Sequence, residues 1–502
     1  MSNLAELLAP CMPLALPRGA ANVGITDMTQ DSREVRAGSL FVALKGAMHH
    51  GLEFARQACE QGAAAILWEP ADGIEVPQPP GNIPCVAVPD LSARAGLIAD
   101  RFFGEPSARL RICAFTGTNG KTTCAYLLAQ CMERLGRKAA YVGTLGWGRI
   151  DALHSLAHTT PDAISVHRLL ATLLAEGVQD VAIEVSSHAL DQHRIAGVRL
   201  HAAAFTNLTH DHLDYHRTMR AYGEAKARLF AFPGLHQCIV NVGDDFGRHL
   251  AERLRGDSRL LAAWIDADGS ADAWSGARHL RARQVSCEAR GLTMEFDGTC
   301  GSVALHARLI GRFNAENLAI VLGCLLSLGV AAPLAAAALG ECEAPPGRME
   351  IVPSGAAGKP LAVVDYAHTP DALAKALGAL REHCAGELWC VFGCGGDRDP
   401  AKRPMMGAVA DTLADRIIVT DDNPRSENPQ AITREIAAAI TRHKPQVIAD
   451  RAQAIAAALR AAGAADVVLI AGKGHEDYQI YGAMRRKFSD RSEAMRHLRD
   501  AA

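Results

Sequence analysis

The chain of 502 residues lacks several features that would place it in a specialised class. Its net charge is only −3, so no overall basic field favours binding to nucleic acid or to an anionic membrane. Aromatic residues make up 5% of the sequence, which fits a helix-rich α/β fold better than a β-sandwich. Any anionic ligand must therefore be held by local groups.

Cysteine pairs and export signals are also lacking. The 14 cysteines include no Cys-x-x-Cys pair, and scattered cysteines are typical of reduced, buried thiols in the cytoplasm. The apolar residues 1–21 have no basic segment, carry Glu6 and are interrupted by prolines. We therefore expect a cytoplasmic protein that is not exported.

One stretch, residues 318–340, contains no charged residue and is long enough to span a bilayer, which needs ~20 residues. Gly329 and Pro333 divide it into two short pieces, and much of the second piece is weakly hydrophobic alanine. We therefore expect two buried helices joined by a turn.

Chain length and patterning indicate several domains. Single hydrophobic cores stop growing near ~250–300 residues, so about two to four domains are expected. Short apolar strands alternate with helical segments, which predicts α/β domains with mostly parallel sheets covered on both faces. We expect a small N-terminal domain over 1–106, a central domain over 107–347 and a doubly wound, Rossmann-like domain over 348–502. Gly347, in Pro-Pro-Gly-Arg, is a natural hinge.

The strongest motif is a glycine-rich loop that follows an apolar strand and opens a helix. Its residues are Gly117, Thr118, Asn119, Gly120, Lys121, Thr122 and Thr123. Glycines let successive N–H groups face a phosphate, and the helix N-terminus adds positive potential. Lys121 supplies a charge for the β- and γ-phosphates, and the Thr122 hydroxyl is placed to bind Mg²⁺. The common phosphate loop has a glycine where Phe115 stands, but a chance turn is a poorer explanation.

A second segment, residues 206–216, contains three histidines and Asp214. Read alone, it comes close to the H-x-H-x-D-H signature of metallo-β-lactamase-fold hydrolases. The spacing differs because Tyr215 separates Asp214 from His216, and this alternative leaves the phosphate loop unexplained.

The variant phosphate loop resembles the ATP site of the Mur ligase and folylpolyglutamate synthetase superfamily, and further matches to the Mur ligase family follow across nearly the whole chain. The resemblance implies an ATP- and Mg²⁺-dependent ligase that forms amide bonds, with Lys121 as a catalytic residue. It also implies that Glu184 and His212 bind Mg²⁺ and that Lys226 is a carbamylated lysine, N6-carboxylysine. Without the resemblance, Lys226 reads as an exposed helix lysine. A carbamate there would hold a second Mg²⁺ near the γ-phosphate.

The same resemblance implies two further sets of contacts. Beyond the phosphate loop, the ATP contacts are Asn314, Asn317, Arg348, Asp365 and His368. The contacts to a UDP-sugar substrate are Ser32, His49 in the loop Ala47-Met48-His49, Thr159, Thr160, Ser187, Gln192 and Arg194. Several of these segments are also compatible with ordinary turns and helix caps.

A motif in the third domain resembles that of Mur ligases that add diaminopimelate. The residues implied to bind the amino acid are Arg398, Asp422, Asn423, Pro424, Arg425, Gly472 and Glu476. Meso-diaminopimelate differs from lysine by a second carboxylate at its far end, which an arginine can clamp with two hydrogen bonds. Arg425 and Arg398 are the candidates for this clamp, and Glu476 would bind the ammonium. The alternative for Arg425 is a surface ion pair with Asp421 or Asp422.

The resemblance thus implies a monomeric enzyme that adds meso-2,6-diaminopimelate to UDP-N-acetylmuramoyl-L-alanyl-D-glutamate through an acyl phosphate. Its partners would be these small molecules and ATP, with neither nucleic acid nor membrane insertion. An L-lysine-adding relative, a folylpolyglutamate synthetase and a non-enzymatic nucleotide switch remain alternatives. The base that deprotonates the attacking amine is not indicated by the sequence.

Overall fold

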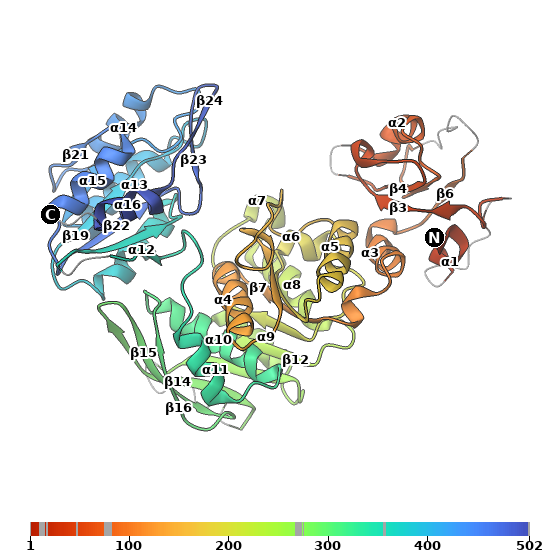
Figure 1. Cartoon of the computed structure of the whole chain (residues 1–502), viewed down its shortest axis with the longest axis horizontal. Coiled ribbons are helices and arrows are strands. Elements are labelled where there is room, and N and C mark those ends of the chain that lie inside the picture. The colour runs from red at the N-terminus through yellow and green to blue at the C-terminus, as the bar shows by residue number, and fades with distance from the viewer. Residues whose placement is uncertain are drawn as a thin grey trace. The chain divides into compact units, whose positions relative to one another are not determined.

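The computed structural model describes residues 2–9, 16, 19–46, 49–74, 83–266, 274, 276–354 and 358–499. The chain divides into two compact units, residues 1–261 and 262–502. Each unit contains a large, mostly parallel sheet covered by helices, which confirms the expected α/β class (Figure 1).

The first unit begins with a small parallel sheet in the order β3-β4-β5-β6. Its strands are β3 (Asp27–Thr29), β4 (Ser39–Ala43), β5 (Ala65–Trp68) and β6 (Cys85–Ala87), next to a short antiparallel pair, β1 (Ser2–Asn3) and β2 (Gly24–Ile25). Helices α1 (Leu4–Leu8) and α3 (Leu91–Phe102) pack on one face and α2 (Ala55–Glu60) on the other. Successive residues of β4, such as Leu40 and Phe41, belong to the two opposite cores, as expected of a strand covered on both faces.

The larger sheet of this unit runs in the order β12-β11-β7-β10-β8-β9. Its strands are β7 (Arg111–Thr116), β8 (Ala139–Gly143), β9 (Gly146–Gly148), β10 (Asp180–Glu184), β11 (Ala202–Phe205) and β12 (Gln237–Asn241). Its helices are α4 (Lys121–Arg134), α5 (Ala163–Ala175), α6 (Ser187–Asp191), α7 (Leu213–His216), α8 (Met219–Ala227) and α9 (Asp245–Arg253). All neighbouring strands are parallel except β8 and β9. The carboxyl ends of β7, β10 and β11 therefore meet at one edge, where α/β sheets place ligands.

Direct contacts fix the small sheet to the larger one within this unit. Arg168 on α5 places Nη1 2.7 Å from the Asp27 carboxylate on β3. The backbones also approach closely, because a Cβ on Gly96 would lie 2.1 Å from the Ala196 carbonyl oxygen. The two sheets of the first unit are thus joined by an ion pair and by close backbone packing.

The second unit begins with strands that the sequence did not reveal. Strand β13 (Leu260–Ile265) crosses the unit boundary, and its residues 262–265 pair in parallel with β14 (His279–Glu288). Strands β15 (Gly291–Gly298) and β16 (Val303–Ala307) continue this sheet in antiparallel fashion. Helices α10 (Phe313–Ser327) and α11 (Ala332–Gly340) confirm the two helices predicted over 318–340. In the described part of the chain, no helix is long and apolar enough to cross a membrane.

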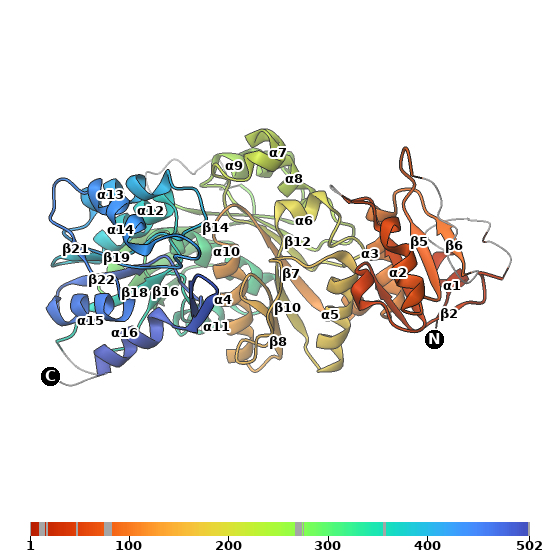
Figure 2. The same cartoon turned by 90° about the horizontal axis from the view of Figure 1, so that it is seen from above.

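The rest of the second unit is built on a six-stranded sheet in the order β17-β18-β22-β19-β20-β21. Its strands are β17 (Glu350–Ile351), β18 (Leu361–Asp365), β19 (Leu388–Phe392), β20 (Arg416–Val419), β21 (Gln446–Val447) and β22 (Val467–Ala471). The helices are α12 (Pro370–Arg381), α13 (Lys402–Leu413), α14 (Pro429–Ala438), α15 (Arg451–Ala461) and α16 (Asp490–Arg499), and a hairpin of β23 (Tyr478–Tyr481) and β24 (Met484–Lys487) precedes α16. All strand pairs in the sheet are parallel except β17 with β18. Figure 2 shows α12, α13 and α14 on one face and α15 and α16 on the other, as in a doubly wound domain.

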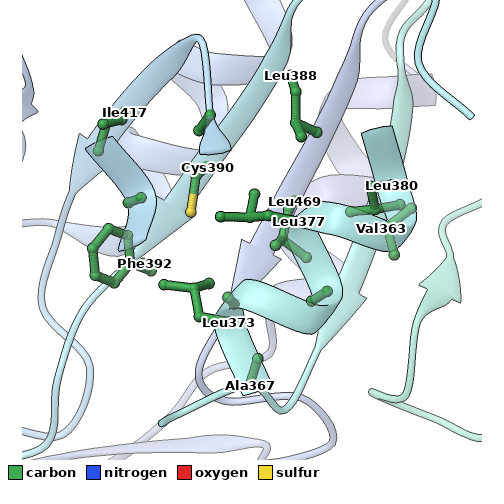
Figure 3. Packing of buried hydrophobic residues seen from close by; sticks show 14 of the residues in the cluster. Val363, Ala367, Leu373, Leu377, Leu380, Leu388, Cys390, Phe392, Ile417 and Leu469 are labelled. Atoms are coloured by element: carbon green, nitrogen blue, oxygen red, sulfur yellow. The ribbon is translucent and has the colours of Figure 1, made fainter. Parts of the chain in front are cut away.

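The core between α12 and this sheet shows why the segment folds as it does. Leu373, Leu377 and Leu380 lie at helical spacing on α12 and belong to the same core cluster as Cys390 and Leu469 of the sheet (Figure 3). All five side chains are fully buried. This packing anchors β19 and β22, whose carboxyl ends lead into the loops described below.

A fully buried ion pair lies on the opposite face of the same sheet. Arg451 donates through Nε and Nη2 to the Asp490 carboxylate, both at 2.7 Å, and Nη2 also donates to the Ala471 carbonyl at 2.9 Å. Removal of one partner of a buried pair leaves the other charge uncompensated, at a cost of ~3–5 kcal/mol. We therefore expect Asp490→Ala to shift the urea unfolding transition of this domain strongly toward lower concentrations.

An exposed pair on the same helix provides the matched control. Arg496 and Glu493 lie 2.5 Å apart, and the arginine side chain is 59% exposed. Glu493→Ala should cost less than about 1 kcal/mol, because water screens such pairs. Equal transition midpoints for the two variants would show that the buried pair does not stabilise the domain.

Candidate functional site

The phosphate loop connects β7 to α4 in the first unit. Gly117 has φ +150° and Gly120 has φ +86°, conformations that favour glycine. A Cβ on Gly117 would lie 1.9 Å from Thr206 Oγ1, so a side chain there would collide with the segment after β11. The same threonine donates to the Asn119 carbonyl at 2.6 Å, and Asn119 N donates to Asn207 Oδ1 at 3.0 Å. The conformation of the loop is thus stabilised by the segment that follows β11.

The side chains of Lys121 and Thr122 form hydrogen bonds within and beside this loop. Lys121 extends back over the loop and donates from Nζ to the carbonyls of Gly117 and Thr118 at 2.9 and 2.8 Å. Thr122 Oγ1 donates to Glu184 Oε2 at 2.9 Å. Glu184 ends β10 and is fully buried. A hydroxyl and a carboxylate therefore meet beside the phosphate loop, and oxygen ligands are those that Mg²⁺ prefers.

Two residues that hold Glu184 were not predicted. Tyr141 donates its phenolic hydrogen to Glu184 Oε1, which also accepts from the Thr144 N–H at 2.9 Å. The Thr144 hydroxyl donates to Oε2 at 3.2 Å. Tyr141 is fully buried in an apolar strand, and nothing in the sequence distinguishes it from an ordinary core residue.

Lys226 lies against the same loop. Its side chain is 1% exposed, which contradicts the reading as an exposed helix lysine. Nζ donates to the Gly117 carbonyl at 2.7 Å and lies 4.3 Å from the centre of the Tyr222 ring. Burial lowers the pKa of the Lys226 ammonium well below its usual value, and the nearby Lys121 charge lowers it further. A neutral amine is the form that reacts with carbon dioxide, so the site is suited to carbamate formation.

The histidine-rich segment follows β11. His212 immediately precedes α7 and has φ +51°, and its half-exposed side chain packs edge-on against His188 with ring centres 4.9 Å apart. His216 Nε2 lies 2.9 Å from the Ser187 hydroxyl. Over the described ranges, no group of three or more His, Cys, Asp or Glu side chains is arranged to hold a metal ion. This finding gives no support to a metallo-β-lactamase-type hydrolase.

Four of the predicted substrate contacts are linked around the carboxyl end of β10. Thr160 Oγ1 donates to the Glu184 carbonyl at 2.9 Å, and Arg194 Nη1 donates to the Thr160 carbonyl at 2.9 Å. Gln192 Oε1 accepts from Arg194 Nε and Nη2 at 3.0 and 2.7 Å. Thr159 Oγ1 lies 3.2 Å from the Thr144 hydroxyl. These side chains are therefore grouped around the end of β10, whose Glu184 carboxylate accepts from Thr122 of the phosphate loop.

The two contacts predicted in the small sheet bond to separate partners. Ser32 Oγ donates to Gln57 Oε1 at 2.9 Å. His49 is exposed, with Nδ1 3.1 Å from Glu53 Oε2. Ala47 and Met48 of the same predicted loop lie outside the described residues. Ser32 and His49 thus form separate contacts and do not belong to one cluster of side chains.

The predicted ATP contacts of the second unit fall into two groups. Asn314 and Asn317 are buried at the start of α10, where Asn317 Nδ2 donates to Asn314 Oδ1 at 2.8 Å. Arg348 stacks over the Tyr366 ring at 4.9 Å, and its Nε is buried without a hydrogen-bond partner among the described residues.

Asp365 and His368 complete the second group at the end of β18. The Asp365 carboxylate accepts from the N–H groups of Met349 and Ala367 at 2.8 and 2.9 Å. Burial raises the pKa of the Asp365 carboxyl, while these donors and the Arg348 charge lower it. His368 is exposed, and its Nδ1 lies 2.8 Å from the Tyr366 carbonyl.

Several residues predicted to bind the amino acid lie close together where β19, β20 and β22 end. Asn423 Nδ2 donates to Glu476 Oε2 at 2.9 Å, and a Cβ on Gly472 would lie 2.6 Å from Asp422 Oδ2. Arg425 has φ +52° and donates from Nη1 to the Gly396 carbonyl at 2.7 Å. Within the described residues it forms no ion pair with Asp421 or Asp422, so the surface-pair alternative is wrong.

Two other predicted members and one unpredicted residue border this site. Arg398 is exposed on the loop after β19, and Pro424 is buried beside Arg425. Lys473 is fully buried and donates to both Asn423 Oδ1 and Glu476 Oε2 at 3.2 Å. The one signal in the sequence is the position of Lys473 two residues after the apolar strand β22, at the edge where α/β sheets bind ligands.

Three family models match successive parts of the chain. The model described as Mur ligase family, catalytic domain, matches residues 24–101. The Mur ligase middle domain matches residues 115–325, and the Mur ligase, glutamate ligase domain, matches residues 347–474.

Curated relatives match over nearly the full length. The UDP-N-acetylmuramoyl-L-alanyl-D-glutamate--2,6-diaminopimelate ligase of Alkalilimnicola ehrlichii is 45% identical over 505 residues, with 99% of each chain covered. The ligase of the same name from Pseudomonas aeruginosa is also 45% identical, with 97% of this chain and 98% of the relative covered.

Solved structures give the same picture. A structure of a UDP-N-acetylmuramoyl-L-alanyl-D-glutamate--2,6-diaminopimelate ligase has a TM-score of 0.75 and 33% identity, covering 99% of this chain and 98% of that one. A Mycobacterium tuberculosis folylpolyglutamate synthase complexed with ADP and AMPPCP has a TM-score of 0.59 and 16% identity, covering 76% of this chain and 92% of that one. At that identity the second likeness concerns the fold alone.

Proposed function

The chain belongs to the Mur ligase family, and we propose on that premise which of its residues perform the reaction of its diaminopimelate-adding relatives. It is an ATP-dependent ligase that joins 2,6-diaminopimelate to UDP-N-acetylmuramoyl-L-alanyl-D-glutamate by an amide bond, in peptidoglycan precursor synthesis. The observation that carries this conclusion is the full-length match at 45% identity. The phosphate loop at Lys121 and the Asn423–Glu476 cluster, held in the same chain, support it.

The reaction proceeds in two stages. The γ-carboxylate of the D-glutamyl residue first receives the γ-phosphoryl group of ATP, which gives an acyl phosphate and ADP. An amine of meso-diaminopimelate then attacks the acyl carbon, inorganic phosphate leaves, and the amine loses a proton. Such transfer asks the protein mainly for positioning and charge stabilisation, and no covalent nucleophile is required.

The loop that binds the phosphates of ATP consists of Gly117, Thr118, Asn119, Gly120, Lys121, Thr122 and Thr123. Its N–H groups and the α4 N-terminus attract negative charge, and Lys121 adds a mobile cation. We propose Thr122, Glu184, His212 and carbamylated Lys226 as ligands of Mg²⁺. Bound there, Mg²⁺ would supply the positive charge that offsets repulsion between the phosphates and the attacking carboxylate. The contact of 2.9 Å between the Thr122 hydroxyl and the Glu184 carboxylate supports this oxygen-rich set.

Substrate recognition is proposed for residues of both units. The contacts to the UDP-muramoyl dipeptide are Ser32, His49, Thr159, Thr160, Ser187, Gln192 and Arg194. The further ATP contacts are Asn314, Asn317, Arg348, Asp365 and His368. The amino-acid contacts are Arg398, Asp422, Asn423, Pro424, Arg425, Gly472 and Glu476, with the arginines on the distal carboxylate and Glu476 on the distal ammonium.

We further propose that the enzyme acts as a monomer in the cytoplasm, with boundaries near residues 106 and 347 separating three domains. Its partners are small molecules, and a net charge of −3 supports neither a nucleic-acid nor a membrane partner. The scattered spacing of the 14 cysteines, which is typical of reduced thiols, supports a reducing compartment.

The proposed function is tested by phosphate release from ATP in the presence of UDP-N-acetylmuramoyl-L-alanyl-D-glutamate. Release should require an acceptor, and meso-diaminopimelate should support it far better than L-lysine, which lacks the distal carboxylate. Comparable use of L-lysine would refute the specificity while leaving the ligase. No release with either acceptor, combined with release on a folate substrate, would instead favour a folylpolyglutamate synthetase.

A further inference from the structure

Lys473 lies beneath the amino-acid site, immediately after β22. Its side chain is fully buried, so it has no surface with which to contact a substrate. Nζ donates to Glu476 Oε2 and to Asn423 Oδ1, both at 3.2 Å. A buried lysine is costly unless such partners compensate it, so these contacts account for its position.

The contacts of Lys473 fix the orientation of the Asn423 amide. Asn423 Oδ1 accepts from Lys473 Nζ and from the Ile480 N–H at 3.1 Å, so the oxygen must point toward these two donors. The amide nitrogen is then directed at Glu476 Oε2, where it donates at 2.9 Å. The Asn423 side chain is 2% exposed and has no room to rotate freely.

Glu476 is consequently bound on one oxygen only. Oε2 accepts from both Asn423 and Lys473, while Oε1 accepts no hydrogen bond within the described part of the chain. The Glu476 side chain is 19% exposed, in contrast to the buried Lys473. One carboxylate oxygen is therefore held from behind, and the other remains available for a ligand on the open side.

We propose that Lys473 is a positioning residue that sets acceptor specificity by holding Glu476 with one oxygen directed at the distal ammonium of the amino-acid substrate. The inference rests on the proposed function, since it requires Glu476 to bind that ammonium. Lys473 acts through Glu476 and Asn423 and contacts no substrate. Charge-assisted hydrogen bonds of this kind change affinity by about 10- to 100-fold when one partner is removed.

The test compares two acceptors in the full-length enzyme and in Lys473→Met. One acceptor is meso-diaminopimelate, and the other is 2-aminopimelate, which keeps the reacting amine and the distal carboxylate but lacks the distal amine. Lys473→Met should raise KM for diaminopimelate about 10- to 100-fold and change KM for 2-aminopimelate less than about threefold. The kcat and the KM for ATP should remain close to those of the wild type.

A purely structural role of Lys473 would penalise both acceptors equally, and that result would overturn the inference. Lys487→Met is the matched control, because it removes an exposed lysine from β24 and should leave both KM values unchanged. If the methionine variant does not fold, Lys473→Gln, which keeps a donor but loses the charge, gives the same comparison. If the wild-type enzyme is inactive with diaminopimelate, the proposed function itself is overturned. If the wild type is active and Lys473→Met raises KM equally for both acceptors, this inference alone is overturned.

Discussion

Replacing Lys226 by alanine should lower kcat by about a thousandfold, because loss of one group that stabilises transition-state charge commonly costs about 10²- to 10³-fold. The structure makes Lys226 suitable for this role. Its amine is buried 2.7 Å from the Gly117 carbonyl of the phosphate loop, and burial lowers its pKa well below the usual value. An uncharged amine can add carbon dioxide and release one proton to water, which leaves a carbamate anion with one N–H for the bond to Gly117.

Two companion variants separate the carbamate from a simple cation. Lys226→Arg keeps a positive charge but cannot form a carbamate, so it should be as inactive as Lys226→Ala. Small carboxylates such as acetate or formate should restore part of the activity of Lys226→Ala, since they can occupy the vacated volume with an anion. Lys138→Ala, an exposed lysine of the same unit, serves as the control and should retain full activity. Full activity of Lys226→Arg in a steady-state phosphate-release assay would disprove the carbamate role.

The fold was largely predictable because its strands are short, apolar and buried on both faces. Strand β19 (Leu388–Phe392) is an example, because it is an uninterrupted apolar run and every one of its residues is buried. The antiparallel strands β14 to β16 were missed for the opposite reason. In β14 the residues from Arg283 to Glu288 are exposed or only partly buried, so an apolar run does not mark the strand. The strand is instead defined by its pairing with β15, in which the register shifts between Arg283 and Ser286.

The site was predictable where local sequence determines geometry and unpredictable where distant segments meet. The phosphate loop is contiguous, and its glycines and Lys121 were read directly from the sequence. The buried environment of Lys226 depends on contact with Gly117, which is 109 residues away, and no local pattern reveals it. Tyr141 was missed for the same reason, because its partner Glu184 lies on another strand.

Arg425→Ala should raise KM for meso-diaminopimelate by about 100-fold or more, because a desolvated arginine–carboxylate pair contributes two charge-assisted hydrogen bonds. Arg425 adopts φ +52°, a conformation that costs energy for any residue with a Cβ. Alanine has the same Cβ, so the substitution removes the guanidinium without adding backbone strain. Nη1 donates to the Gly396 carbonyl, and the other guanidinium nitrogens have no hydrogen-bond partner among the described residues.

The comparison with L-lysine isolates the contribution of the distal carboxylate. L-Lysine has no such group, so the low activity with L-lysine should be the same in Arg425→Ala as in the wild type. The preference for diaminopimelate over L-lysine should therefore fall by the same factor as the affinity for diaminopimelate. Arg425→Lys should recover only part of the affinity, since a point charge cannot reproduce the planar fork of a guanidinium. Arg485→Ala on the neighbouring hairpin is the control, because Arg485 stacks on Tyr478 at 4.0 Å and has no assigned substrate contact. An equal loss with both acceptors would mean that Arg425 shapes the loop, and that another residue, with Arg398 the next candidate, binds the distal carboxylate.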